Sequence, residues 1–139
     1  MGLAVNKATG TPLVRKLGVK PGMRMAVLNA PEGFDVTLGG ELPEDVAVAR
    51  RLGGSKDVVL AFVTARRDLE RRLGALRAAI APDGMVWVAW PKRASGVATD
   101  VTEDVIRAVV LPTGLVDVKV CAIDATWSGL KLVIRKELR

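Results

Sequence analysis

The chain has 139 residues, half of them hydrophobic, and its formal net charge is +6. This length suits one domain with its own core, and the composition is that of a packed globular chain rather than a disordered one. The sequence contains no histidine, which excludes nucleophiles activated by histidine and metal sites with histidine ligands. A single cysteine, Cys121, excludes an internal disulfide and a CxxC motif. It lies in an apolar stretch, and we expect it to be buried.

The N-terminal segment and the lengths of the apolar runs indicate where the domain begins and in which compartment the protein resides. Residues 1–11 are mixed and contain glycine, which predicts a flexible arm before a single domain at 12–139. Lys7 interrupts the N-terminal segment before it can form the apolar centre of a signal peptide. The longest apolar runs, 58–63 and 85–90, are far shorter than the about 20 residues of a membrane-spanning helix. We therefore expect a cytoplasmic protein.

In chain order, the first predicted elements are a short helix and a buried strand. Residues 13–17 can form one or two helical turns that end at Gly18. A turn follows at 20–22, and the unbroken apolar residues 25–28 then indicate a buried strand over 23–29.

The next two segments carry mixed signals. Pro31 at a first helical position, followed by Glu32, predicts a short helix at 31–38. Residues 44–52 fit two structures, because their acidic start and basic end suit a capped helix while valines alternating with alanines suit a strand. We predict a strand at 45–50.

The middle of the chain predicts a strand and then a helix. Residues 57–63, which are all apolar after Asp57, are typical of a strand inside a parallel sheet. Thr64 can cap the following helix, which ends before the turn at 82–84. The apolar residues of this helix fall on one narrow stripe, consisting of Leu69, Leu73, Leu76 and Ile80.

A further strand and helix follow. Residues 85–90 are apolar and end at a proline, and 92–99 read as a loop. Asp100 and Glu103 form a D-x-x-E pattern, which predicts a capping box at the start of a helix. The valines expected on its inner face are Val101, Val105 and Val109.

The last two predicted strands, 116–123 and 131–135, are joined by a turn at 125–129 and form a hairpin. Strands and helices alternate before it. This order predicts a three-layer α/β domain with a mostly parallel, Rossmann-like sheet that ends in an antiparallel hairpin.

Two segments resemble class I methyltransferases. One is LGVKPGMR at 17–24, which enters an apolar strand. The other is DVVLAF at 57–62, followed by a helix and by APDG at 81–84. The resemblance implies a shortened class I methyltransferase-like sheet, with the last strand inserted beside the preceding parallel strand.

A second resemblance covers nearly the whole chain from Leu13 onward. The chain is similar to a bacterial family of small proteins known only as a domain of unknown function, and this family brings no activity with it. The resemblance lies in NAPEGF at 29–34, WPK at 90–92, ASG at 94–96, TD at 99–100, KVCAID at 119–124 and TWSGLK at 126–131.

The chain departs from a methyltransferase where the cofactor would bind. A nucleotide fold needs a glycine-rich turn after its first strand, so that the backbone can approach the ligand. Here the turn at 29–33 has one glycine and a proline, and only 27 residues lie between Ala30 and Lys56 inclusive. A single βαβ unit already takes about 30 residues. We expect no bound S-adenosylmethionine, no other cofactor and no metal.

Ligands of open parallel sheets bind outside the carboxyl ends of the strands. We expect four segments to meet there, at 29–34, 64–67, 90–96 and 124–129. In these segments Trp90 and Trp127 would give a ligand flat apolar contact, and Lys92 and Arg93 would hold an anion. The alternative is structural, with the tryptophans in the core and the polar residues closing turns. The candidate ligand-binding residues are Asn29, Glu32, Arg66, Trp90, Lys92, Arg93, Ser95, Asp124, Trp127 and Ser128.

Catalysis is not indicated by this set. Lys92 could serve as a base or a Schiff-base amine, and Asp124 or Glu32 as a carboxylate base, but no spacing compels a mechanism. The arginines of the 66–77 segment are interleaved with acids and have no aromatic platform beside them, which makes a nucleic-acid partner the weaker interpretation.

We therefore expect a non-methylating binding or accessory protein for a small anionic or aromatic ligand. The alternatives are a small methyltransferase-like transferase that acts on an anionic substrate, and a weak nucleic-acid binder.

Overall fold

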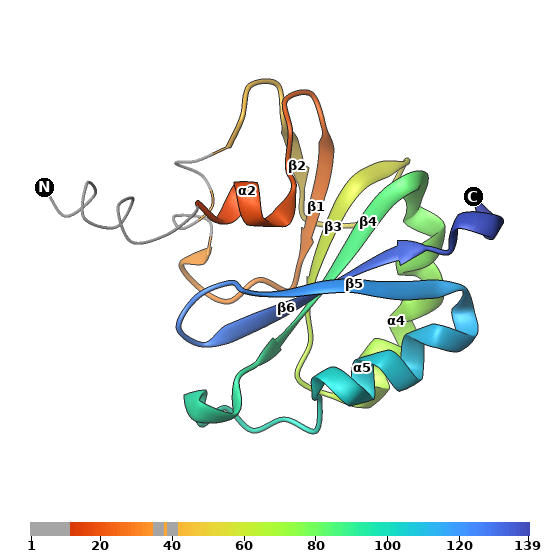
Figure 1. Ribbon diagram of the computed structural model, residues 1–139. Helices are drawn as coiled ribbons and strands as arrows, with labels where there is room; N and C mark the ends of the chain where they lie inside the picture. The colour runs from red at the N-terminus through yellow and green to blue at the C-terminus, as the bar shows by residue number, and fades with distance from the viewer. Residues whose placement is uncertain (1–11, 35–37, 39–41) are drawn as a thin grey trace, which may run out of the picture.

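The computed structural model describes residues 12–34, 38 and 42–139 (Figure 1). The arm predicted at 1–11 and the centre of the short helix predicted at 31–38 lie outside this part. The described helices and strands are α2 Leu13–Leu17, β1 Arg24–Leu28, β2 Ala47–Ala49, β3 Lys56–Phe62, α4 Arg66–Ala79, β4 Ile80–Pro91, α5 Glu103–Val110, β5 Leu115–Ala122 and β6 Trp127–Ile134.

The strands form one six-stranded sheet in the order β2-β1-β3-β4-β6-β5. β1 pairs in parallel with β2 and β3, and β3 pairs in parallel with β4. β6 inserts antiparallel between β4 and β5. This topology confirms the mostly parallel α/β sheet with a terminal hairpin, and the strand predicted at 45–50 is present as β2.

Apolar side chains cover both faces of the sheet. On one face, α4 and α5 pack Leu76 and Ile106 over β3, β4 and β6. On the other, α2 packs Leu17 over Phe62 and Trp87, and the Trp87 indole donates to the Leu17 carbonyl at 2.9 Å. Figure 1 shows α4 and α5 together on one side and α2 on the other. β3 and β4 are buried between these two layers, which explains why their sequences are continuous apolar runs.

The central helix keeps its predicted inner face but not its predicted ends. Leu69, Leu73 and Leu76 are buried as expected. The residue that precedes the helix is Ala65, and Thr64 does not cap it. β4 starts at Ile80 and runs through the residues predicted to form a turn. Gly84 permits this, because a Cβ there would lie 3.1 Å from three backbone oxygens of neighbouring chain segments.

The capping box predicted for the next helix is wrong. The residue before α5 is Thr102, whose hydroxyl accepts from the Val105 amide at 3.1 Å. Asp100 lies too early for that role and binds α4 instead. Because the helix starts at Glu103, its buried residues are Ile106 and Val110, while the valines at 105 and 109 are only partly buried.

The hairpin turn also closes earlier than predicted. The Asp124 carboxylate accepts from the amides of Thr126 and Trp127, both at 2.8 Å. These bonds complete the turn by residue 126, so β6 begins at Trp127, four residues before the predicted start.

Candidate functional site

The topology places a switch point at the carboxyl end of β1. The chain moves from β1 to β2 on one side and then crosses back to β3 on the other. Ligands of open α/β sheets bind beside such a point. The crossover from β2 to β3 consists only of residues 50–55 and contains no helix, whereas crossovers between parallel strands usually need a dozen or more residues.

This short crossover leaves a hollow on the α4 side of β1, with a volume of about 320 Å³. Leu28, Leu52 and Leu76 supply its apolar wall. The described residues that line it are Leu28, Asn29, Arg50, Arg51, Leu52, Arg72, Ala75 and Leu76. We call it the β1 pocket.

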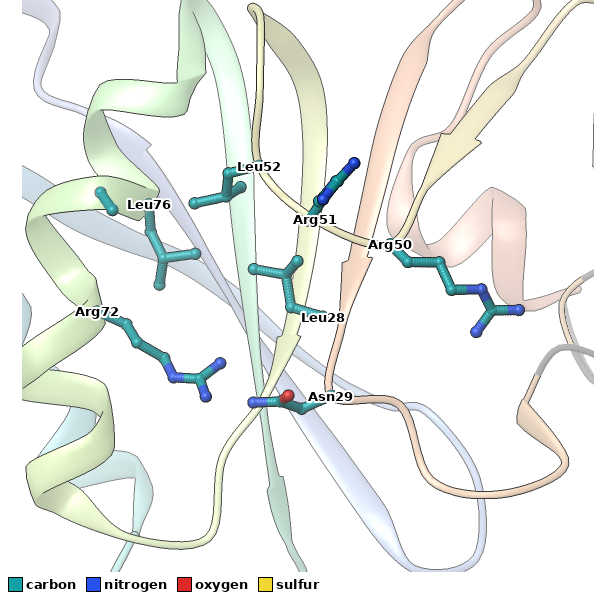
Figure 2. A pocket seen from close by; sticks show the side chains of 8 residues that line it. Leu28, Asn29, Arg50, Arg51, Leu52, Arg72 and Leu76 are labelled. Carbon is teal, nitrogen blue, oxygen red and sulfur yellow. The ribbon is translucent and has the colours of Figure 1, made fainter.

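Arg72 of α4 and Asn29 at the end of β1 point toward one another in this pocket (Figure 2). With its amide oxygen turned toward α4, Asn29 accepts from Arg72 Nη2 at 2.8 Å and also from Nη1. Asn29 has a φ of 57°, the left-handed conformation that asparagine tolerates better than most residues.

The charge of the β1 pocket is positive. Of its described lining residues three are arginines and none is acidic. Figure 2 shows Arg72 directed toward the end of β1 and Arg50 extended away from it. An arginine guanidinium presents a planar fork of donors that matches a carboxylate or a phosphate. The pocket therefore suits an anion attached to an apolar group.

A second hollow, of about 240 Å³, lies beyond the end of β4. Two of the predicted site residues line it, Trp90 and Arg93. Its other lining residues are Pro91, Val97, Thr99, Val101 and Thr102.

The edge between these two hollows is closed by the chain itself. The Asp100 carboxylate accepts from the Arg66 amide at 2.7 Å, at the first turn of α4. The Thr99 hydroxyl donates to the Thr64 carbonyl at 2.6 Å. A helix N-terminus carries partial positive charge and free amides that favour an anion. In this protein an internal carboxylate binds there.

The predicted residues at the hairpin tip form structural hydrogen bonds. Lys92 Nζ donates to the Asp124 carbonyl at 2.7 Å, and the Lys92 amide donates to the Thr126 carbonyl at 2.8 Å. Lys92 thus binds the main chain of Asp124, while the Asp124 carboxylate accepts from the amides of Thr126 and Trp127. The Ser95 hydroxyl donates to the Lys92 carbonyl at 2.6 Å and orders the loop.

The two tryptophans do not face one ligand. Trp90 is 9% exposed and packs in the core on the α4 and α5 side, whereas Trp127 packs in the opposite core. Trp127 meets the Phe62 ring edge-on, with centroids 5.0 Å apart. In the β4–β6 ladder Trp90 is opposite Ser128 and Pro91 is opposite Trp127, and neighbouring residues of a strand point to opposite faces.

The remaining candidates are dispersed. Arg66 forms an ion pair with Glu70 at 3.3 Å, and both side chains are about half exposed. Glu32 is exposed. The predicted set thus divides into four parts. Asn29 lies in the β1 pocket, Trp90 and Arg93 line the second hollow, and Arg66 and Glu32 lie apart from both. The structural group around the hairpin tip consists of Lys92, Ser95, Asp124, Trp127 and Ser128. The arginines of the β1 pocket were not predicted as site residues. Arg72 belongs to a helix whose arginines are interleaved with acids, and Arg50 and Arg51 form the basic end of the segment 44–52.

Cys121 is only partly buried, on the α2 side of β5. Burial raises the pKa of its thiol, although Lys16 and Lys119 act in the opposite direction. The cysteine is therefore a protonated thiol at neutral pH.

Neither a family model nor a curated protein matches the sequence. Solved structures match its fold. A SAM-dependent methyltransferase from Aquifex aeolicus superposes with a TM-score of 0.68 at 12% identity, over 88% of each chain. The ribosomal protein L11 methylase from Lactobacillus delbrueckii subsp. bulgaricus gives 0.58 at 12% identity, over 88% of this chain and 75% of the methylase. A putative methyltransferase from Thermoplasma acidophilum gives 0.57 at 11% identity, over 91% of this chain and 76% of its own.

The protein therefore has a class I methyltransferase-like Rossmann fold. In the described part of the chain, no helix is long and apolar enough to cross a bilayer.

The β1 pocket does not fit the cofactor of those enzymes. S-adenosylmethionine carries a sulfonium cation, and in dinucleotide folds a carboxylate binds the ribose hydroxyls. The segment that follows β2 has Arg50 and Arg51 instead, and Arg72 adds a third cation. Pro31 removes one amide donor from the turn after β1. The residues present favour a negative ligand over a positive one.

Proposed function

We propose that this chain is a non-methylating binding or accessory protein, and that the β1 pocket binds a small anion with an apolar part. The observation that carries the proposal is the Arg72 guanidinium, held by Asn29 beside an apolar wall at the switch point. Binding requires no catalytic group.

The pocket supports this ligand class in two ways. Arg72 is positioned before binding, since both of its terminal nitrogens contact the Asn29 amide. A group that is held in place loses little conformational entropy when a ligand arrives. The leucines of the wall, Leu28, Leu52 and Leu76, favour an apolar group next to the anion.

The rival function is a methyltransferase-like transferase acting on an anionic substrate, and it depends on the cofactor. Titration calorimetry with S-adenosylmethionine separates the two. We expect no measurable heat, because the sulfonium would enter a site lined by Arg51 and Arg72 and the β1 turn lacks a glycine-rich approach. Micromolar affinity, about −8 kcal/mol, would favour the transferase.

The anion can be tested independently with octanoate and octyl phosphate as probes. We expect at least one of them to bind, and Arg72→Gln to weaken this binding by about tenfold or more, because a hydrogen bond to a charged group contributes about 1.5–3 kcal/mol. Arg71→Gln is the matched control, since Arg71 neighbours Arg72 in α4 but is 70% exposed and pairs with Asp68. Equal losses in both variants, or no binding of either probe to the wild type, would contradict the proposal.

A further inference from the structure

Four lysines gather on the α2 side of the hairpin, outside both hollows. Lys119 of β5 is directly opposite Lys131 of β6 in the ladder. Lys16 of α2 reaches the same hairpin, where its Nζ donates to the Ala122 carbonyl at 3.3 Å. Lys20, between α2 and β1, is close enough to act on the charge of Lys131. We call these four residues the lysine face.

The lysine face is an unfavourable arrangement for the folded chain alone. Burial, Lys119 and Lys20 all lower the pKa of the Lys131 ammonium. Within the described residues, none of the four lysines forms an ion pair with an acid. Like charges directly opposite in an antiparallel pair are destabilising. An anion bound from outside would relieve this repulsion.

Three of the five arginines of α4 differ from these lysines. Arg71 pairs with Asp68 at 2.8 Å, Arg66 pairs with Glu70 at 3.3 Å, and Arg72 contacts Asn29. Their charges are already partly neutralised within the helix or directed to the β1 pocket. The lysine face is therefore the better candidate for an external polyanion.

We propose that the lysine face binds the phosphate backbone of a single-stranded nucleic acid without reading its bases. Lysine has a compact charge that suits contacts with phosphate. It lacks the planar pair of donors with which an arginine can recognise a base. A nucleic-acid strand carries one negative phosphate per nucleotide, so several cations held close together on the hairpin and beside α2 can each contact one. Base stacking does not contribute, because Trp87 is fully buried and Trp127 packs edge-on against Phe62.

The test is fluorescence anisotropy with a labelled single-stranded RNA of mixed sequence, titrated over a series of salt concentrations. Four phosphate contacts predict a slope of about −3 for log K against log salt, from about 0.7 per contact on a single strand. The double variants Lys119→Gln/Lys131→Gln and Lys16→Gln/Lys20→Gln should each lower affinity at low salt and reduce the slope by about 1.4.

The control is Arg67→Gln/Lys136→Gln, which removes the same charge from two exposed residues on α4 and near the C-terminus. We expect it to keep the slope of the wild type. Thermal melts verify folding, and the Lys119→Gln/Lys131→Gln variant should melt no lower than the wild type because it removes repulsion. No binding at low salt, equal losses in the control, or equally tight binding of polyglutamate would each overturn the proposal.

Discussion

At the residue scale, polar side chains at a ligand-binding edge can serve the fold alone. The Asp124 carboxylate accepts two backbone amides and closes the hairpin turn. The Lys92 ammonium donates to the Asp124 carbonyl from the preceding strand end. Together they fix the hairpin tip against β4, so the proposed function assigns the anion to Arg72 of the β1 pocket rather than to Lys92.

This assignment predicts the effects of two substitutions on stability. Lys92→Ala should lower the free energy of unfolding by about 1 kcal/mol, the value of one hydrogen bond, and Asp124→Ala by about 1–2 kcal/mol because two amides lose their acceptor. Urea unfolding measures both, with the exposed Lys136→Ala as the control. If Lys92→Ala left stability unchanged but abolished anion binding, the ligand would bind at the hairpin tip instead.

At the element scale, ion pairs join neighbouring elements. Arg107 of α5 donates to the Asp117 carboxylate of β5 at 2.9 Å, and it also pairs with Glu103 and Asp104 of its own helix. The hydrogen bond to Arg107 is the largest cause that holds the pKa of the Asp117 carboxyl below its usual value. α5 is thus anchored to the edge strand by charge as well as by its buried isoleucine.

The lowered pKa predicts a pH-dependent stability. The folded Asp117 binds a proton less readily than the unfolded one, so its stabilisation is complete above the unfolded pKa of about 3.9 and is lost as the pH falls through the folded value. Asp117→Asn should therefore lower the urea midpoint at pH 7, and the difference from wild type should shrink in acid. Asp83→Asn, at an exposed residue, is the control. A difference that stays constant from neutral to acid pH would rule out the ion pair as its cause.

At the scale of the whole molecule, stability is distributed unevenly across the sheet. β3 and β4 lie in the middle of the sheet with buried residues facing both cores, while β2 has three residues and sits at an edge. Amides that open only through global unfolding exchange most slowly. Hydrogen exchange should therefore be slowest in β3 and in β4 from Met85 onward, and fast in β2. Equal protection of β2 and β3 would mean that the β2 edge is covered by a partner.

The sequence alone determined the main elements of the sheet. Runs such as 58–63 and 86–90 contain no polar residue, and a strand can carry such a run only when both its faces are buried. The stripe of leucines at 69, 73 and 76 likewise fixed the inner face of α4, because helical periodicity is local. These properties depend on neighbouring residues and need no knowledge of distant ones.

Only the tertiary structure decided the site. Asn29 meets Arg72 across 43 residues, and Asp100 binds the first turn of α4 across 34. The separation of the two tryptophans depends on where the hairpin turn closes, because a shift of one residue in an antiparallel register moves every side chain to the other face. Composition and periodicity carry no information about register or about which distant segments meet. The sheet was therefore predictable from sequence, whereas the arginine pocket and the lysine face were not.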